Sequence, residues 1–452
     1  MSGFNKQQSS VPFVYLSFIF SLVIGFLWFP RLLIFLKNQD NAARYYQAAF
    51  GRLKYPTDKL TQKMFDNIIT EGLYAENRIL EDILRNNKYF FEMVEKAILL
   101  KRCDFSFGKE YKFATLTKPI PNLISTRNTV NLLLLRGRTR ELNHDYTGAI
   151  NNYKCALIFC NHLLQERKDS GMVIMLMSLF NAVRGYVPLQ QLVEEKSMDT
   201  LLLKDVFYFL KACEQDMIFL PTVIDNERAN YQLAKLALQK DIINAFMSDE
   251  KRKEHYLNKL NERFDEVERR YYSLIRNYAS TNSTADGEEM QRQLGELSER
   301  NQRQTIEGLV SLLQKDPVNG GDALVQQVPE IFFSMAWPDL IKLNNIYYVC
   351  QAKLRILMTA VAVRIYYDTN KKFPDALEEL VPDYFESTVI DPWTGEALSY
   401  LLTENEVVIY SVGPDRIDNK GLGANRESVS LNSLQNKDLT VSIRKDRFIL
   451  SK

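Results

Sequence analysis

The chain has 452 residues, of which 46% are hydrophobic, and this composition excludes a wholly disordered protein. Its 57 basic and 56 acidic side chains leave a net charge of +1, which disfavours a generally basic nucleic-acid-binding protein. Only 18 glycines and 14 prolines are present, so we expect long helices and few turns.

The first predicted element is a membrane anchor at residues 13–36. Residues 13–29 carry no charge and are long enough to reach the lower limit for crossing a hydrocarbon core of about 30 Å. Tyr15 and Trp28 lie near the two ends, where amphipathic rings prefer the membrane interface. A buried core helix is the alternative, and a cleaved signal peptide fits less well because no small-residue cleavage site follows.

Two cues place the large part of the chain after the anchor in the cytoplasm. Arg31, Lys37 and Arg44 follow the apolar segment, whereas only Lys6 and the amino terminus precede it. The five cysteines are odd in number and show no C-x-x-C spacing, so we expect buried thiols rather than a disulfide framework or a zinc site.

Small residues repeat at helical spacing in two places beyond the anchor. Ala149, Tyr153 and Ala156 follow Gly137 by twelve residues or more, and residues 42–49 repeat the alanine–tyrosine–alanine pattern. This spacing resembles the tetratricopeptide repeat, a pair of antiparallel helices. It predicts either one helical hairpin within an irregular bundle or a degenerate repeat array.

A long amphipathic helix is predicted from residue 256 to residue 278. Aromatic and aliphatic residues recur every three or four positions, which favours packing in a bundle and leaves a coiled coil as the alternative. A polar turn at 281–287 and a second, polar helix at 288–315 are expected next. The proline and the two glycines at 316–321 predict a boundary, and we assign 317–338 to a linker.

The carboxyl-terminal part predicts a small α+β domain. A long helix is expected over 339–368, ended by Asn370 and Pro374. After it comes a turn that runs into a strand, at 391–400. A β-rich run at 406–412 and a polar loop at 413–421 follow, and two further strands are expected at 439–443 and 447–450.

This part resembles the carboxyl-terminal domain of the major pseudopilin of type II secretion systems. The resemblance rests on four elements in order, found at Tyr366–Pro374, Asp391–Gly395 with Tyr400, Tyr410–Asp415 and Asp438–Leu439. Similar modules end large membrane-anchored bacterial proteins such as those of planctomycetes. The glutamate that follows the pseudopilin leader is absent after Gly3-Phe4, so a processed filament subunit is not expected.

The resemblance implies one structural calcium ion, held by Asp415 and Asp438. Calcium takes six to eight oxygen ligands, which a polar loop can supply. Asp418 and Asn419 are local alternatives, and an ordinary turn capped by its own aspartate and asparagine side chains remains the other interpretation. Trp393 is expected to anchor the sheet in the core.

The predicted domains are a tail and anchor (1–37), a helical body with tetratricopeptide-like hairpins (38–316), the linker (317–338) and the pseudopilin-like domain (339–452). No phosphate-binding, dinucleotide, zinc-protease or serine-hydrolase motif occurs, and His144 is expected to lie in a turn. We therefore expect a non-catalytic binding or assembly protein of the bacterial inner membrane, with a protein partner, no nucleic acid and no evident small-molecule substrate. The pseudopilin resemblance implies that the body is extracytoplasmic, against the charges that follow the anchor, and we adopt that placement. The protein would work beside type II secretion or pilus-like machinery. The alternatives are a hydrolase with a scattered site in the helical body and a scaffold facing the cytoplasm.

Overall fold

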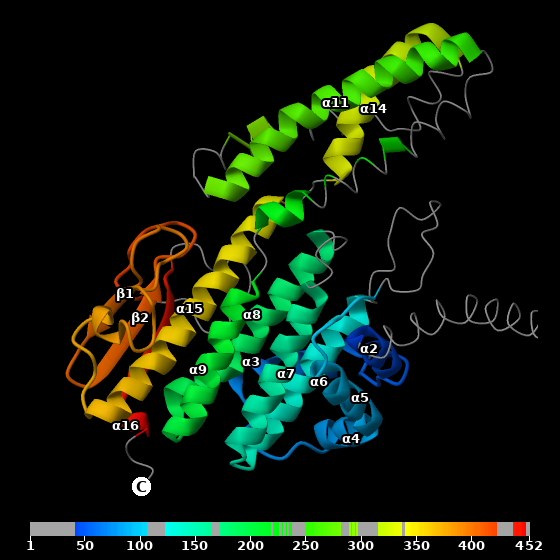
Figure 1. Ribbon diagram of the computed structural model, residues 1–452. Helices are drawn as coiled ribbons and strands as arrows, with labels where there is room; N and C mark the ends of the chain where they lie inside the picture. Colours follow the sequence, from blue (N-terminus) through cyan, green and yellow to red (C-terminus); the bar gives the residue numbers. More distant parts are fainter. Residues whose placement is uncertain are drawn as a thin grey trace, which may run out of the picture.

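A computed structural model describes residues 41–105, 123–164, 172–217, 220–225, 228, 232, 235–236, 250–281, 289–290, 292–293, 295–296, 315–336, 340–422 and 437–448. The chain is mainly helical, with one small antiparallel sheet near its carboxyl end (Figure 1). The predicted mainly helical class with a small sheet is confirmed. The predicted anchor and most of the polar helix expected at 288–315 lie outside the described residues.

Four short helices open the described chain: α2 (Ala42–Phe50), α3 (Lys59–Glu71), α4 (Arg78–Asn86) and α5 (Lys88–Ile98). The first three each begin at an asparagine or aspartate whose side chain accepts a hydrogen bond from a first-turn amide. Helix α2 packs against α5. The start of α2 lies beside the segment that follows α5, where the Ala42 amide donates to the Arg102 carbonyl at 2.8 Å.

The predicted helical hairpin is confirmed as α6 (Leu123–Leu142) and α7 (Tyr146–Leu164), which pack together. Ala149, Tyr153 and Ala156 are fully buried. A Cβ at Gly137 would lie 2.2 Å from Cε1 of Tyr153, so glycine is required for the ring to lie flat against α6. The small residues thus do what the spacing predicted and let the two helices approach closely.

Two further helices, α8 (Met172–Glu195) and α9 (Thr200–Gln215), complete the bundle. Helix α8 packs on α7 and α6, and it also contacts α3. None of the five cysteines forms a disulfide, and all except the half-buried Cys155 are buried. The prediction of buried thiols without a disulfide is confirmed for Cys103, Cys160, Cys213 and Cys350.

Helices α11 (Glu250–Thr281) and α14 (Pro317–Ala336) form a separate pair that lies side by side at one end of the molecule (Figure 1). The predicted apolar stripe of α11 faces this partner and is buried except at the half-buried Leu274. Most of the predicted linker is instead helix α14. Pro317 takes the first helical position, where its missing N–H costs nothing, and Gly321 lets α14 approach the ring of Tyr256.

The predicted long helix is α15 (Leu340–Asn370), and it is buried on more than the one expected side. Val349, Ile356 and Val363 are buried as deeply as Cys350 and Val361 on the predicted face. The reason is its central position, because α8 and α9 pack on it from the bundle while β2 and β3 also pack on it (Figure 1). Among the described helices, only the stretch Leu343–Asn370 has the length and apolar composition of a membrane span, and 78% of its most apolar window is buried in the protein.

The sheet has the order β1 (Ser399–Leu402), β2 (Glu406–Ser411) and β3 (Leu439–Arg444), all antiparallel, and the short 3-10 helix η1 (Leu377–Leu380) precedes it. The strand predicted over 447–450 is not formed in its described part. Residues 445–448 make the helical turn α16, because β2 begins at Glu406 opposite Arg444 and leaves no partner for a longer β3.

The sheet is joined to the helical body by polar contacts as well as by α15. Gln190 of α8 donates to the Thr440 carbonyl at 3.0 Å, and Glu194 accepts from the Ser442 amide at 3.2 Å. Arg364 of α15 donates to the carbonyls of Val193 and Lys196 and so satisfies the end of α8. The predicted carboxyl-terminal domain therefore shares one packed core with the bundle.

Candidate functional site

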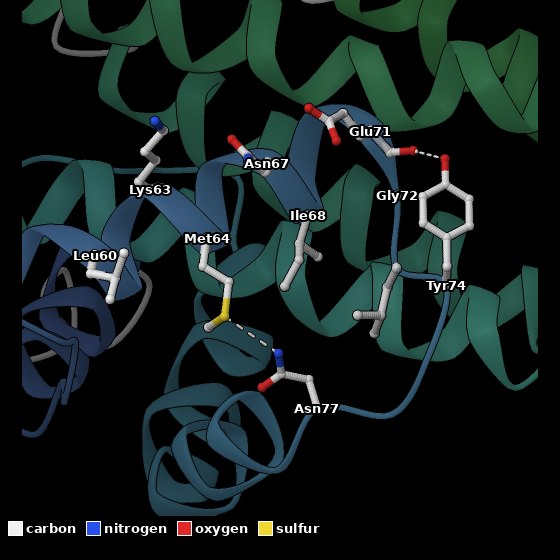
Figure 2. Close-up of a pocket in the computed structure, with 10 residues that line it drawn as sticks. Leu60, Lys63, Met64, Asn67, Ile68, Glu71, Gly72, Tyr74 and Asn77 are labelled. Carbon is white, nitrogen blue, oxygen red and sulfur yellow. Dashed lines mark hydrogen bonds between the residues drawn. The ribbon is translucent and has the colours of Figure 1, made fainter.

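An open groove of about 490 Å³ runs along α3 and the segment that follows it (Figure 2). Its walls are largely apolar and include Leu60, Met64, Ile68, Leu73 and Tyr74. Leu60 and Tyr74 are 82% and 84% exposed, which is unusual for large apolar side chains that line one concavity. This arrangement can accept apolar atoms from outside the chain.

Local hydrogen bonds hold the two walls of the groove together. Helix α3 ends at Gly72, whose φ of 109° is accessible to glycine and turns the chain back along the helix. The Tyr74 hydroxyl donates to the Glu71 carbonyl at 2.6 Å, and Asn77 Nδ2 donates to Sδ of Met64 at 3.4 Å (Figure 2). Asn77 also caps α4 by accepting from the Leu80 amide at 3.0 Å. The groove is therefore a formed feature of the folded chain.

A second, more polar cavity of about 260 Å³ adjoins the groove and shares residues 71–74 with it. Its other walls come from the ends of α6 and α8 and from the turn between α6 and α7. The polar groups on these walls include Arg138, Glu141, His144 and Glu195. The two concavities together form a continuous surface that is apolar at one end and polar at the other.

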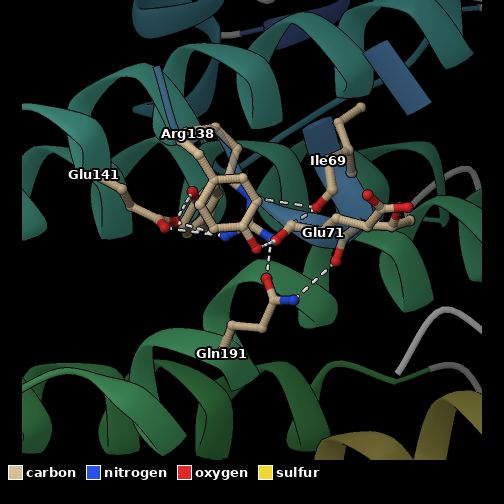
Figure 3. A network of polar contacts seen from close by, with 8 residues as sticks. Ile69, Glu71, Arg138, Glu141 and Gln191 are labelled. Atoms are coloured by element: carbon tan, nitrogen blue, oxygen red, sulfur yellow. Dashed lines mark hydrogen bonds and ion pairs between the residues drawn. The ribbon is translucent and has the colours of Figure 1, made fainter. Parts of the chain in front are cut away.

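The floor of the polar cavity is a network around the buried Arg138 (Figure 3). Its guanidinium binds both carboxylate oxygens of Glu141, at 3.0 and 3.1 Å, and donates to the Ile69 carbonyl at 2.8 and 3.2 Å. It also donates to Gln191, whose own amide donates to the Thr70 carbonyl at 2.8 Å. Two carbonyls left open at the end of α3 are thus satisfied by α6 and α8.

Glu141 is fully engaged inside this network. Besides Arg138, it accepts a hydrogen bond from the hydroxyl of Tyr153, the tyrosine of the predicted hairpin motif. Burial raises the pKa of Tyr153 well above its ordinary value, so the phenol stays protonated and keeps donating. The network therefore joins α3, α6, α7 and α8, and it offers no free acid or base on these residues.

His144 is in the turn between α6 and α7, as predicted, with a φ of 60°. Its exposed ring lies at the edge of the polar cavity, and its Nδ1 is 3.3 Å from the Tyr146 hydroxyl. The cap of α7 is Asp145, which accepts from the Gly148 amide at 2.9 Å. His162, in contrast, is buried in the core with Tyr46. No serine, threonine or cysteine is among the residues that line the polar cavity.

The predicted metal ligands lie in the loop after β2, where two of the three come together. Asp438 is buried and accepts from the amides of Asn419 and Gly421, at 3.3 and 2.8 Å. Burial raises its pKa, and the nearby charge of Asp418 raises it further. Both oxygens of Asp438 are thus occupied by backbone amides.

The other two aspartates cap their own turns. Asp418 accepts from the Tyr410 hydroxyl at 3.1 Å and from the Lys420 amide at 2.7 Å, and Asp415 accepts from the Ile417 amide at 3.1 Å. Within the ranges that the structure describes, no group of three histidine, cysteine, aspartate or glutamate side chains is placed to hold a metal ion. The described side chains fit a capped turn better than a calcium site, and calcium binding stays a prediction.

Asp391 fixes the turn that precedes β1, a role that the sequence analysis did not assign. It is buried and accepts from the Trp393 amide, the Ser411 hydroxyl and the Val412 amide at 2.9, 2.9 and 3.1 Å. Trp393 is buried beside Tyr348 of α15, with ring centroids 5.4 Å apart, so the prediction that it anchors the sheet in the core is confirmed.

Comparisons with known proteins show no similarity: no family model, no curated protein and no solved structure matches the chain.

Proposed function

We propose that this chain is a membrane-anchored, non-catalytic binding or assembly protein of the bacterial cell envelope, and that the groove along α3 holds an apolar segment of a protein partner. The observation that carries the proposal is the exposure of Leu60 and Tyr74 in a formed, largely apolar concavity. A soluble surface normally avoids such a patch unless it binds something. Peptide-binding grooves use this combination of apolar walls and polar ends.

The polar cavity would fix the orientation of the bound segment. An apolar stretch of the partner would lie against Leu60, Met64 and Tyr74, and its polar flank would reach Glu195 and His144. The Arg138 network supports this floor from below, since it ties the end of α3 to α6 and α8. A preformed floor of this kind lowers the cost of ordering the partner.

The membrane placement rests on the sequence of residues 13–36, which is long and apolar enough to span a bilayer. The pseudopilin resemblance supports an extracytoplasmic body and a setting beside type II secretion or pilus-like machinery. Its expected order of long helix, loop and small antiparallel sheet agrees with the order of α15, η1 and β1–β3. A reporter that is active in only one compartment, fused after Lys452, separates this placement from a scaffold facing the cytoplasm.

The groove is tested by charge substitution in native membranes. Leu60→Asp and Tyr74→Asp place a carboxylate on the apolar wall, and Tyr208→Asp is the matched control because Tyr208 is 65% exposed on α9 outside the groove. After gentle solubilisation, a native gel should show a complex for the unchanged chain and for Tyr208→Asp, and the free chain for the two groove variants. A complex of unchanged size in all variants would contradict the proposal.

A hydrolase is the second candidate function, because His144 lines the same cavity as Glu71, Glu141 and Glu195. In that case His144 would act as the base for a water molecule, helped by the Tyr146 hydroxyl. Turnover of ester or amide substrates by the unchanged chain, lost in His144→Gln and retained in His255→Gln, would support this candidate. Equal background rates in all three would leave the binding function.

A further inference from the structure

The start of the described chain is held firmly at one place on the helical body. Asn41 is only 2% exposed. Its Nδ2 donates to the Asp104 carbonyl at 2.7 Å, and its Oδ1 accepts from the amides of Asp104 and Ala43 at 2.8 and 3.2 Å. The two bonds to Asp104 hold residue 41 against the segment after α5, and the bond from Ala43 caps α2.

Because residue 41 is held in this way, the short segment before it limits the distance between the helical body and the proposed anchor. The apolar segment ends at residue 36, and the five steps to Asn41 span at most about 18 Å when fully extended. The interfacial region accounts for roughly 6 Å of that distance on each side of the hydrocarbon core. The end of the body that carries Asn41 must therefore lie within reach of the lipid headgroups.

The side chains at this end are mostly basic. The juxtamembrane face, as we name it, consists of exposed side chains from the start of α2 and the end of α5: Arg44, Lys96, Leu99, Lys101 and Arg102. Leu99 is 80% exposed in the middle of these charges. The helices that carry it, α2 and α5, lie on the flank of the bundle away from the sheet (Figure 1).

The neighbouring acidic groups do not cancel this charge. Asp104 pairs with Arg102 at 3.2 Å, and Glu95 pairs with Arg136 of α6. Arg44, Lys96 and Lys101 form no ion pair within the described chain. Glu92 and Glu95 are both exposed on α5, and because Glu95 pairs with Arg136, only Glu92 of these two acids is left to offset the three cations. Each lysine or arginine near a bilayer contributes about 1 kcal/mol of attraction to an anionic surface.

We infer that the juxtamembrane face binds the anionic phospholipid headgroups of the membrane in which the chain is anchored, with Leu99 inserted at the interface. The inference rests on the proposed anchor at residues 13–36. It fixes the orientation of the body, because docking α2 and α5 on the lipid surface turns the sheet away from it. The carboxyl-terminal module would then be presented to partners at a distance from the bilayer.

The test uses the full chain reconstituted in two kinds of vesicle. One kind is neutral phosphatidylcholine, and the other contains about one-third phosphatidylglycerol, whose charged headgroups attract basic side chains. A fluorophore is attached to Leu99→Cys or, as control, to Leu401→Cys in β1, both in a Cys155→Ala background because the other four thiols are buried. Quenching by a headgroup nitroxide lipid reports the distance to the surface, and flotation of the vesicles reports anchoring.

We expect quenching at position 99 to be at least about twofold stronger in anionic than in neutral vesicles, since several charges act together. Arg44→Glu with Lys101→Glu should remove this difference, and position 401 should show little quenching in either lipid. Equal quenching at 99 in both lipids, with normal flotation, would overturn the inference and leave the anchor intact. Loss of flotation would overturn both.

Discussion

Tyr46 of α2 and His162 of α7 share a buried hydrogen bond of 2.8 Å that joins the first described helix to the central hairpin. The atoms that meet are the Tyr46 hydroxyl oxygen and Nδ1 of His162, and the backbone of Leu100 also interacts with the histidine ring. Phe159 packs edge-on against the Tyr46 ring, with centroids 4.7 Å apart. These contacts hold α2, which begins directly after Asn41, in a fixed position against α7 in the core of the bundle.

The buried histidine should make stability depend on pH. Burial lowers the pKa of His162 to about 4, from an ordinary value of 6.5. Below pH 6.5 the unfolded chain binds a proton that the folded chain does not, so stability falls as the pH drops from 6.5 towards 4. The expected loss between pH 7 and pH 5 is about 2 kcal/mol.

Urea unfolding of the full chain in detergent at both pH values measures this loss. His162→Gln keeps a hydrogen-bonding side chain beside Tyr46 and removes the titrating group, so its stability should change less between the two pH values. His144→Gln is the matched control, because His144 is exposed, and it should behave like the unchanged chain. The same pH dependence in His162→Gln as in the unchanged chain would show that His162 is not the source.

The close packing of the hairpin predicts a large effect of a small change. Gly137→Ala places a methyl group against the ring of Tyr153, which is fully buried and held by its hydrogen bond to Glu141. We expect a loss of about 1–3 kcal/mol in the free energy of unfolding. Gly295→Ala, where the new methyl group meets nothing within 4 Å, should be neutral or stabilising by up to about 1 kcal/mol. Equal effects at both positions would contradict the packing described for α6 and α7.

The Arg138 network predicts an asymmetric double-mutant cycle. Arg138→Met leaves the largely buried Glu141 without its cation and the Ile69 carbonyl without a donor, which should cost about 3–5 kcal/mol. Adding Glu141→Gln removes the uncompensated charge while keeping an acceptor for Tyr153, so part of the loss should return. Arg85→Met is the control, because Arg85 pairs with Asp82 at the surface and its side chain is 75% exposed. It should lower the free energy of unfolding by less than about 0.5 kcal/mol. If the loss in the double variant equalled the sum of the losses in Arg138→Met and Glu141→Gln alone, the two charges would not interact.

Much of the architecture follows from local patterns in the sequence. The spacing of Gly137, Ala149 and Tyr153 predicts the α6–α7 hairpin, because only small residues let two helices approach so closely. The stripe of α11, the end of α15 at Asn370 and the order of the strands follow from periodicity and turn residues in the same way. These features depend on residues that are near one another in the chain.

The groove and the polar network depend on contacts between distant residues. Arg138 stands among charged residues in RGRTREL, and it is buried because α3 brings the Ile69 carbonyl to it from 69 residues away. Leu60 and Tyr74 give no sign in the sequence that they stay exposed. The segment of α14 was predicted as a linker because a proline and two glycines normally break helices. In the structure, Pro317 is the first residue of the helix, where proline is tolerated, and Gly321 lies where α14 packs closely on the ring of Tyr256.

The pseudopilin resemblance leads to a test with metal ions. If the loop around Asp415, Asp418 and Asp438 binds calcium, about 1 mM calcium should raise the unfolding temperature of the full chain relative to a chelator. Asp438→Asn should remove this rise, and Asp383→Asn, an exposed aspartate outside the loop, should retain it. Identical unfolding temperatures with calcium and with chelator would reject the ion and leave the three carboxylates as caps of their own turns.

The groove along α3 is tested most directly by a photo-crosslinking residue placed within it in living cells. With benzoylphenylalanine in place of Tyr74, irradiation should give one discrete adduct with a membrane or envelope protein, and Leu60→Asp should abolish it. The same residue in place of Tyr208, which is also exposed but lies on α9 outside the groove, should give no such adduct. Identical adducts from both positions, or none from position 74, would contradict a binding groove at this site.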